Sequence, residues 1–179
     1  MSHDGIIIAA GRNHAYDPPT GTDTLENTPL AHAELNVLAR IQTDRELTTD
    51  VLWSTQQPCS MCEAAIRFCG VGDVVHLAAD PSFAGTAVAL APEVIDPTED
   101  RVEATPLALL ANAMFLQPFI ARGLETTLEH NRSEEPETVQ LAEILAIAGP
   151  PSDVVALLEL VAESLPKLTA ARTLRRTGY

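Results

Sequence analysis

Short apolar runs alternate with polar, turn-forming segments over the first eighty residues. "GIIIAAG", residues 5–11, is a β-branched run bounded by glycines, which predicts a buried strand. "VLWSTQ", residues 51–56, and "DVVHLAAD", residues 73–80, predict two more strands. A helix is predicted between these two, opening at Pro58 and ending near Gly70. Strand, helix and strand at this spacing form a βαβ unit, so the two strands should run parallel.

A long polar segment, residues 12–29, follows the first predicted strand and is rich in Pro, Gly, Thr and Asp. Loops of this length in compact domains are often functional. Thr28 and Pro29 then supply an N-cap and a first helical residue, so a helix is predicted from Pro29 to about Gln42.

From Pro106 the pattern becomes helical, with helices predicted over residues 106–123, 136–149 and 152–165. The last of these is apolar nearly all round, which predicts burial in the domain or in a subunit contact. The polar stretch 132–138 is predicted to be an exposed turn. We therefore divide the chain into a core of residues 1–104 and a helical part, residues 105–179, that packs on the same domain.

Composition and charge narrow the class of protein. A chain of 179 residues that is 46% hydrophobic suits one packed domain. Its net charge of −14, from 25 acidic and 11 basic residues, repels phosphate backbones and favours a small neutral substrate over nucleic acid. The one basic cluster, Arg172, Arg175 and Arg176, is expected only to favour the end of a last helix.

The expected location is cytoplasmic. No apolar run approaches the roughly 20 residues of a membrane helix, and no basic leader precedes residues 6–8. Three cysteines are too few for a disulfide scaffold, so a Cys-x-x-Cys pair indicates metal or redox chemistry.

Candidate chemistry gathers at two helix starts. Cys59 and Cys62 are three residues apart, which puts both sulfurs on one helical face, where the helix N-terminus stabilises thiolates. His32, early in the other helix, could approach from the opposite side. Two thiolates and an imidazole suit zinc and leave a fourth position open, as catalytic sites do. Glu34 need not be a ligand and could reach a water at that position.

Other readings of these residues are weaker. A thioredoxin-like redox pair would leave His32 and Glu34 unexplained, and these two could also be ordinary residues of a first helical turn. Cys69, about two turns further along, is predicted to be a buried core thiol outside the site. His76 is predicted to be a core histidine, and His14 is the one loop histidine that could reach the site. The two motifs together favour zinc.

These motifs, "HAEL" at 32–35, "PCSMCEAAI" at 58–66 and "GRN" at 11–13, resemble those of the zinc-dependent cytidine deaminase superfamily. The resemblance is strongest to the branch of cytosine, guanine and tRNA adenosine deaminases, and it covers about residues 4–85. It implies an α/β/α sandwich with a mixed sheet, to which the helical C-terminal part is added. Homodimers are usual in this branch.

The resemblance also implies roles for individual residues. It implies that zinc is bound by three side chains: His32, Cys59 and Cys62. Glu34 would carry protons during hydrolytic deamination of a cyclic amidine, in which water replaces the amino group and ammonia leaves. Asn13 would hydrogen-bond the base, and the backbone near Ala33 would line the pocket.

The chain departs from the family pattern at three places. Gln57 stands where Glu is usual before Pro-Cys, and Ala64 stands where Gly is common. In the family, a helix and an additional strand precede the "G-x-N" strand. In the sheet, this additional strand lies between the "G-x-N" strand and the strand before Pro-Cys. Only "MSHDG" precedes residue 6, so we expect an N-terminally shortened deaminase. Its sheet should be incomplete, with exposed backbone donors along residues 5–10 unless a C-terminal segment or a partner covers them.

The leading hypothesis is a hydrolase that deaminates a free nucleobase or nucleoside, weakly or with the help of a partner. A tRNA adenosine deaminase is the alternative enzyme, disfavoured by the charge. A catalytically weak, zinc-binding partner subunit is the alternative from another class.

Overall fold

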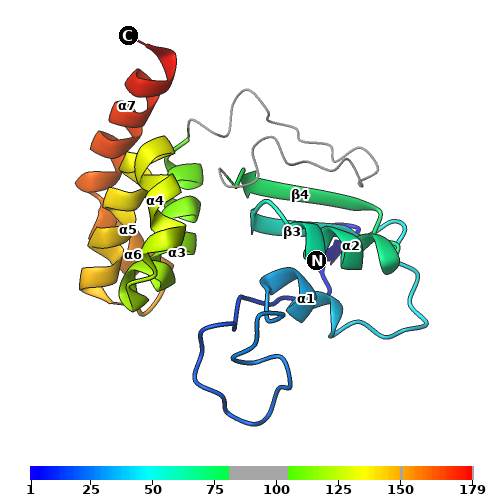
Figure 1. The fold of residues 1–179 in the computed structure, drawn as a ribbon. Helices are drawn as coiled ribbons and strands as arrows, with labels where there is room; N and C mark the ends of the chain where they lie inside the picture. The colour runs from blue at the N-terminus through cyan, green and yellow to red at the C-terminus, as the bar shows by residue number, and fades with distance from the viewer. Residues whose placement is uncertain (81–104, 150, 179) are drawn as a thin grey trace. The chain divides into compact units, whose positions relative to one another are not determined.

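The structure is a computed structural model that describes residues 1–80, 105–149 and 151–178 (Figure 1). These residues fall into two compact units. The first holds Met1–His76, with most of the sheet and two helices, and the second holds the helices that follow residue 105. Within the described ranges, no helix is both long enough and apolar enough to cross a membrane.

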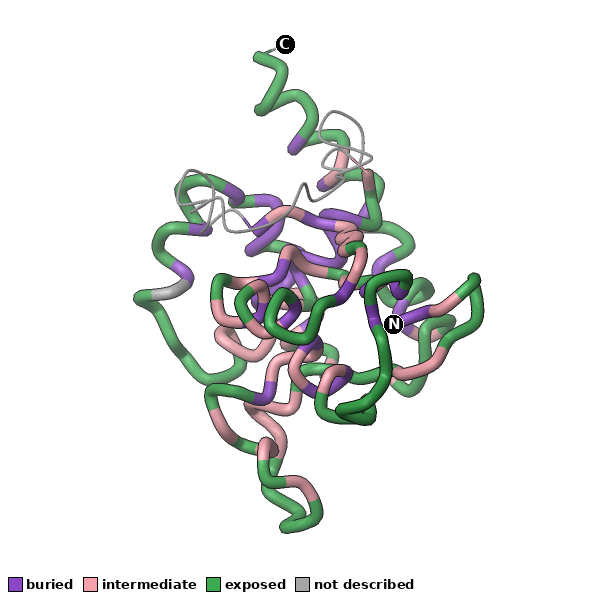
Figure 2. The backbone as a smooth tube through the Cα atoms, turned by 90° about the vertical axis from the view of Figure 1, so that its right-hand side faces the viewer, coloured by how far each residue is buried: buried purple, intermediate pink, exposed green. Residues whose placement is uncertain are grey.

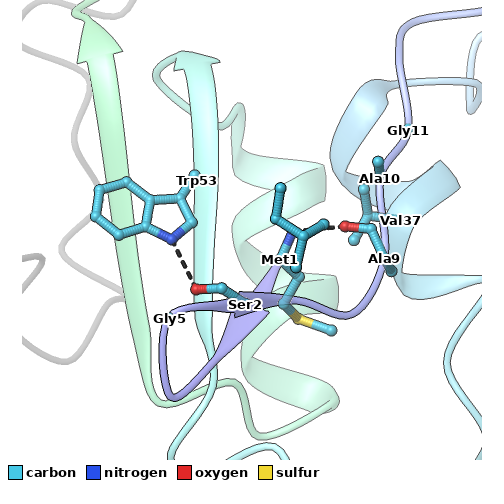
Figure 3. A pocket seen from close by; sticks show the side chains of 9 residues that line it. Met1, Ser2, Gly5, Ala9, Ala10, Gly11, Val37 and Trp53 are labelled. Atoms are coloured by element: carbon cyan, nitrogen blue, oxygen red, sulfur yellow. Dashed lines mark hydrogen bonds between the residues drawn. The ribbon is translucent and has the colours of Figure 1, made fainter.

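The described strands form one four-stranded mixed sheet in the order β2-β1-β3-β4. Its members are β1 (Ser2–His3), β2 (Ile6–Ile7), β3 (Val51–Gln56) and β4 (Asp73–Ala78). β1 is antiparallel to both of its neighbours. The cyan arrow of β3 and the green arrow of β4 point the same way in Figure 3, as the βαβ prediction requires. The α/β fold class predicted from the sequence is therefore confirmed.

The prediction that no strand fits before residue 6 was wrong. Ser2 pairs with Ile7 and His3 pairs with Ile6 across a two-residue turn. The turn residues Asp4 and Gly5 have φ of 47° and 75°, and such a turn matches the twist of a hairpin and favours Asp-Gly. Pairing of Ser2 with Val51 then inserts β1 between β2 and β3.

The first predicted strand is shorter and less buried than expected. Only Ile6 and Ile7 of residues 5–11 join the ladder, because β1 offers them only two partners. Both are exposed, by 69% and 77%, since β2 lies at an edge of the described sheet. Ile8 and Ala9, which follow, are partly buried against the core of this unit.

Two helices cover one face of the sheet: α1 (Ala33–Leu38) and α2 (Ser60–Phe68). α1 is shorter than the predicted 29–42 because turn hydrogen bonds, such as Ala31 N–H to Thr28 O, occupy the residues before it. Along β3, Leu52 is 2% exposed and points into the core, whereas Trp53 is 60% exposed on the opposite face. The core of this unit consists of Met1, Val37, Leu47, Leu52, Ile66 and Val71.

The second unit is a bundle of helices: α3 (Pro106–Arg122), α4 (Glu125–Glu134), α5 (Pro136–Ala148), α6 (Val154–Val161) and α7 (Ser164–Thr177). α3 and α5 match the predicted segments. The segment predicted as one helix over 152–165 instead contains α6 and the start of α7. α4 was not predicted, and the last helix expected to end near Arg176 was predicted without bounds. Fully buried side chains at the centre of the bundle include Leu109, Leu128, Leu141 and Val161.

The stretch 132–138 is not an exposed turn, because Glu135 within it is only 3% exposed. The Glu135 carboxylate accepts hydrogen bonds from the guanidinium groups of Arg172, at 2.6 Å, and of Arg176. Burial raises the pKa of Glu135, but the hydrogen bonds and charges of these two arginines outweigh burial and hold it below its usual value. An ionised carboxylate is therefore stable inside the bundle.

The basic cluster of α7 consequently does more than favour a helix end. Arg175 pairs with Glu137 at 2.9 Å, next to the buried pair of Arg172. Residues 173–178 of α7 and its C-cap are exposed, and the tube near the C-terminus is green in Figure 2. The prediction failed because these contacts join residues about forty positions apart in the chain.

The surface of α6 is also less buried than its composition predicts. Leu157 and Val161 point into the bundle, whereas Val154, Val155 and Leu158 are 68%, 65% and 45% exposed.

Candidate metal centre

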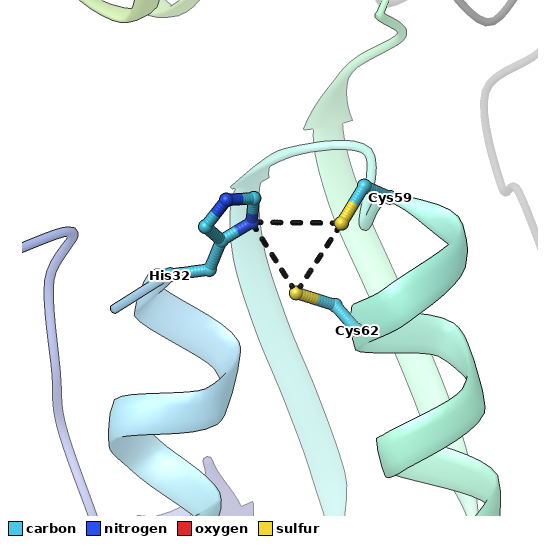
Figure 4. A group of neighbouring side chains, drawn as sticks. All are labelled: His32, Cys59 and Cys62. Carbon is cyan, nitrogen blue, oxygen red and sulfur yellow. Dashed lines mark hydrogen bonds between the residues drawn. The ribbon is translucent and has the colours of Figure 1, made fainter. Parts of the chain in front are cut away.

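Two helix N-termini bring the predicted metal ligands together. His32 is the N-cap residue of α1, and Cys59 is the N-cap residue of α2, both with extended backbone conformations. Cys62 lies one turn into α2 and is fully buried. α1 and α2 contact one another on the same face of the sheet, so the starts of both helices face a common space (Figure 4).

The three donor atoms form a nearly equilateral triangle. Nδ1 of His32 lies 3.5 Å from each sulfur, and the sulfurs of Cys59 and Cys62 lie 3.6 Å apart. Tetrahedral zinc, with Zn–S near 2.3 Å and Zn–N near 2.1 Å, would set the sulfurs about 3.8 Å apart and each about 3.6 Å from the nitrogen. A disulfide would require about 2.05 Å between the sulfurs. The spacing therefore fits a shared metal ion and leaves a fourth tetrahedral position open.

The ionisation of the two thiols is coupled. The hydrogen bond from Cys62 lowers the pKa of Cys59 to about 3. Burial acts in the opposite direction, and the hydrogen bond and charge of His32 lower the pKa further. The same sharing of one proton, together with burial and the charge of Glu34, raises the pKa of Cys62. The two sulfurs therefore share one proton, which binding of a metal cation would displace.

Glu34 lies against this triangle without joining its donor set. Its side chain is 8% exposed, and Oε2 lies 3.5 Å from the sulfur of Cys62. Oε1 accepts a hydrogen bond of 3.0 Å from the hydroxyl of Ser54 on β3. The carboxylate is thus held at one oxygen by the sheet, with its second oxygen beside the metal ligands.

Sequence reasoning missed two residues that organise the site. Ser54 is the first, and Asn36 is the second. Asn36 is 3% exposed, and its side-chain amide donates to the backbone oxygens of Arg12, at 2.8 Å, and Ala31, at 3.2 Å. These bonds join the "GRN" segment to α1. The signal for Asn36 was its position one helical turn after His32, among residues that face inward.

Gly11 allows that segment to approach α1 closely. A Cβ at this position would lie 3.1 Å from the backbone nitrogen of Val37 and 3.2 Å from the carbonyl oxygen of Ala33. Even a Cβ would require the segment or α1 to shift by a few tenths of an ångström, so the glycine of "G-x-N" permits this close packing.

The predicted substrate contacts lie next to this junction. Asn13 is exposed, and its Oδ1 accepts a hydrogen bond of 2.8 Å from the backbone of Ala15. Its NH₂ group makes no hydrogen bond with another described residue, so it can still donate to a ligand. Ala33 is half-buried at the start of α1. Contact of either residue with a substrate stays a prediction.

The remaining cysteine and histidines lie outside the site. Cys69 is the C-cap residue of α2 and is exposed, so the prediction of a buried thiol was wrong. α2 ends at Phe68, which is itself 92% exposed. Nδ1 of His14 lies 3.9 Å from the carboxylates of Asp17 and Glu26. His76 is half-buried on β4. Across the part of the chain that the structure describes, only the His-Cys-Cys triad forms a possible metal-ligand group.

A βαβ unit with His-x-Glu at one helix start and Pro-Cys-x-x-Cys at the next is typical of the cytidine deaminase-like class of proteins. A family model described as MafB19-like deaminase matches residues 1–122, well over half of the chain. The chain belongs to this family, which is a member of the cytidine deaminase-like superfamily. The match extends to the end of α3, beyond the motifs that carry the resemblance. Comparisons with curated proteins and with solved structures found no significant match.

Proposed function

We propose that this chain is a zinc-dependent hydrolase that deaminates the cyclic amidine of a free nucleobase or nucleoside. Water replaces the exocyclic amino group, and ammonia leaves. The observation that carries the proposal is the triangle of His32, Cys59 and Cys62 with the carboxylate of Glu34 against one side. The donor set and its spacing suit zinc, which when bound supplies a Lewis acid that makes water nucleophilic at neutral pH.

The carboxylate of Glu34 is the proton carrier in this proposal. Its Oε1 accepts a hydrogen bond from the hydroxyl of Ser54. Oε2, on the side of the candidate metal ligands, is therefore the oxygen that accepts and donates protons. From there it takes a proton from the attacking water and passes it to the ring nitrogen. It then takes the second proton, from the newly added hydroxyl, and gives it to the amino group, so that a carbonyl forms and ammonia leaves. Because the side chain is 8% exposed, bulk water does not compete for these protons.

The electrostatics of the chain support a small substrate. A net charge of −14 disfavours a polyanion, whereas an uncharged base meets no such repulsion. Asn13 and the backbone of Ala33, at the junction of the "GRN" segment with α1, are the proposed contacts to the base. A dedicated deaminase of tRNA is the alternative reading.

Ammonia release from a panel of substrates tests this proposal. The panel contains cytosine, guanine, adenine, their nucleosides, and RNA and DNA oligonucleotides, with the zinc content of each preparation measured alongside. We expect about one zinc per chain and turnover of at least one small substrate. Turnover of oligonucleotides alone would replace the proposal with its alternative. Stoichiometric zinc with no turnover of any substrate would instead identify a zinc-binding partner subunit.

A further inference from the structure

The side chain of Asn36 is buried in a helix where the local sequence gives no reason for it. α1 has six residues, and asparagine is a poor helix former because its amide competes with the backbone for hydrogen bonds. Asn36 is nevertheless only 3% exposed, and burial of an amide without partners costs free energy. An apolar residue such as leucine would incur neither cost. The hydrogen bonds of this amide are therefore the feature to explain.

The amide nitrogen of Asn36 donates to two backbone carbonyls of the site. Nδ2 lies 2.8 Å from the carbonyl oxygen of Arg12 and 3.2 Å from that of Ala31, which uses both of its hydrogens. Arg12 directly precedes Asn13, the proposed contact to the base. Ala31 directly precedes His32, a candidate metal ligand. One buried side chain thus joins the two segments that carry these residues.

A second hydrogen bond closes this junction on the other side of Asn13. The backbone nitrogen of His14 donates to the carbonyl oxygen of Ala31 at 2.8 Å, so this oxygen accepts from both His14 and Asn36. The peptide groups before and after Asn13 are therefore both anchored. Oδ1 of Asn13 accepts a 2.8 Å hydrogen bond from the backbone nitrogen of Ala15. This leaves the NH₂ group of Asn13 as the part of its side chain that can donate to a ligand.

Close packing at Gly11 adds an apolar contact to the same junction. A Cβ at Gly11 would lie 3.1 Å from the backbone nitrogen of Val37, and Figure 3 shows these two residues side by side. The chain at residues 11–12 therefore runs in contact with α1, and Asn36 supplies the polar part of this contact. Residues 11–14 cannot slide along the helix without breaking the hydrogen bonds of a buried amide, which is costly.

We propose that Asn36 is a positioning residue: it holds residues 11–14 on α1 and thereby places Asn13 relative to the candidate metal ligands, which sets where a base is bound. The holding of residues 11–14 is independent of the deaminase activity. The placing of a base through Asn13 rests on the proposed function.

Amide hydrogen exchange tests the holding without any activity. In Asn36→Leu, a side chain of similar volume replaces the amide and makes none of its hydrogen bonds. We expect the backbone amide of His14 to exchange at least about tenfold faster than in the parent chain. The amide of Ala39, which donates to the carbonyl of Leu35 within α1 at 2.9 Å, should keep its rate. Equal acceleration of both amides would overturn the proposal, because Asn36 would then only stabilise the helix, and an unchanged rate at His14 would overturn it too.

A double-mutant cycle tests the placing, with the substrate identified in the panel. Asn36→Leu should raise KM about 3- to 10-fold and keep kcat within about twofold, since a hydrogen bond lost to the base weakens the ground and transition states alike. Asn13→Ala should raise KM by a similar factor. In the Asn13→Ala background, Asn36→Leu should change KM no further, because Asn36 acts through Asn13. A full, additive rise in that background would overturn the proposal, since a residue with only a structural role does not need Asn13.

Asn36→Ser is a second variant in case the first does not fold. A serine hydroxyl inside a helix donates to the carbonyl one turn earlier, so no buried donor is left unpaired, yet it is too short to reach both carbonyls that Asn36 binds. We expect the same changes in exchange and in KM as with Asn36→Leu. Parental values of both in a folded Asn36→Ser would overturn the proposal.

The two tests separate this proposal from the proposed function. If the parent chain turns over no member of the panel, the proposed function fails and the placing of a base fails with it. The exchange rates of His14 and Ala39 then still decide whether Asn36 holds residues 11–14. If the parent chain is active and exchange at His14 accelerates without any change in KM, the proposed function stands and the placing role of Asn36 is refuted.

Discussion

Replacing Ser54 with alanine removes the one described hydrogen bond that holds Oε1 of Glu34. The bond is 3.0 Å long and ends on a carboxylate that is 8% exposed. A hydrogen bond to a charged, buried group contributes about 1.5–3 kcal/mol. If that contribution is made in the transition state, its loss lowers kcat by about 10- to 150-fold, since 1.4 kcal/mol corresponds to a factor of ten.

The expected pattern is a fall in kcat with little change in KM, because Ser54 touches the proton carrier and not the proposed substrate contacts. Zinc content should stay the same, since Ser54 is not in the donor set. Ser54→Thr keeps the hydroxyl and should restore most of the activity. Thr55→Val, at the exposed neighbouring position of β3, is the matched control and should leave kcat unchanged.

The assay is ammonia release under single-substrate steady-state conditions, with the substrate found in the panel above. The reasoning fails if Ser54→Ala keeps kcat within about twofold of the parent chain, because the bond would then contribute nothing in the transition state. It also fails if Ser54→Thr is as impaired as Ser54→Ala, since the shape of the side chain would then matter and its hydroxyl would not.

Three further predictions follow from the two units. Glu34→Gln should keep fold and zinc while turnover falls about 10²- to 10⁴-fold, and near-parental turnover would exclude Glu34 as the proton carrier. Cys62→Ala should lose the zinc ion that native mass spectrometry detects in the parent chain. A parent chain that instead carries no metal and has a disulfide between Cys59 and Cys62 would favour redox chemistry. Arg172→Met should destabilise the bundle in urea at pH 7 by about 3 kcal/mol, whereas Arg132→Met, in an exposed pair, should cost under about 1 kcal/mol. The pKa of folded Glu135 is held below its usual value of 4.5, so the stabilisation by Arg172 is present above pH 4.5 and lost as pH falls through the folded pKa. The difference in unfolding free energy between the parent and Arg172→Met should therefore narrow in acid. A difference that stays constant with pH would contradict an ionised Glu135 as the partner of Arg172.

The grouping of the candidate metal ligands was predictable because their arrangement is set within short stretches of chain. A spacing of three residues at a helix start puts Cys59 and Cys62 on one face whatever the helix packs against. β3 was predicted to the residue, since a short run with β-branched and aromatic residues between turn signals favours a strand.

The N-terminal hairpin was also present in the sequence but was not recognised. Asp4-Gly5 is a strong signal for a two-residue turn, and a hairpin around it needs only two residues on each side. Counting five residues as too few for a strand overlooked this, because it applied the length of an average strand to the shortest kind of hairpin.

Only the tertiary structure decided which polar groups meet across the core. Ser54 reaches Glu34 across 20 positions of the chain, and Arg172 reaches Glu135 across 37. No local pattern marks such pairs, because their distance depends on how a helix lies on its neighbours. The same holds for Cys69, which is exposed because α2 ends one residue before it. The sequence by itself determined the donors that can bind a metal. The packing of α1 and α2 on β3 determined which carboxylate lies beside those donors and what holds it there.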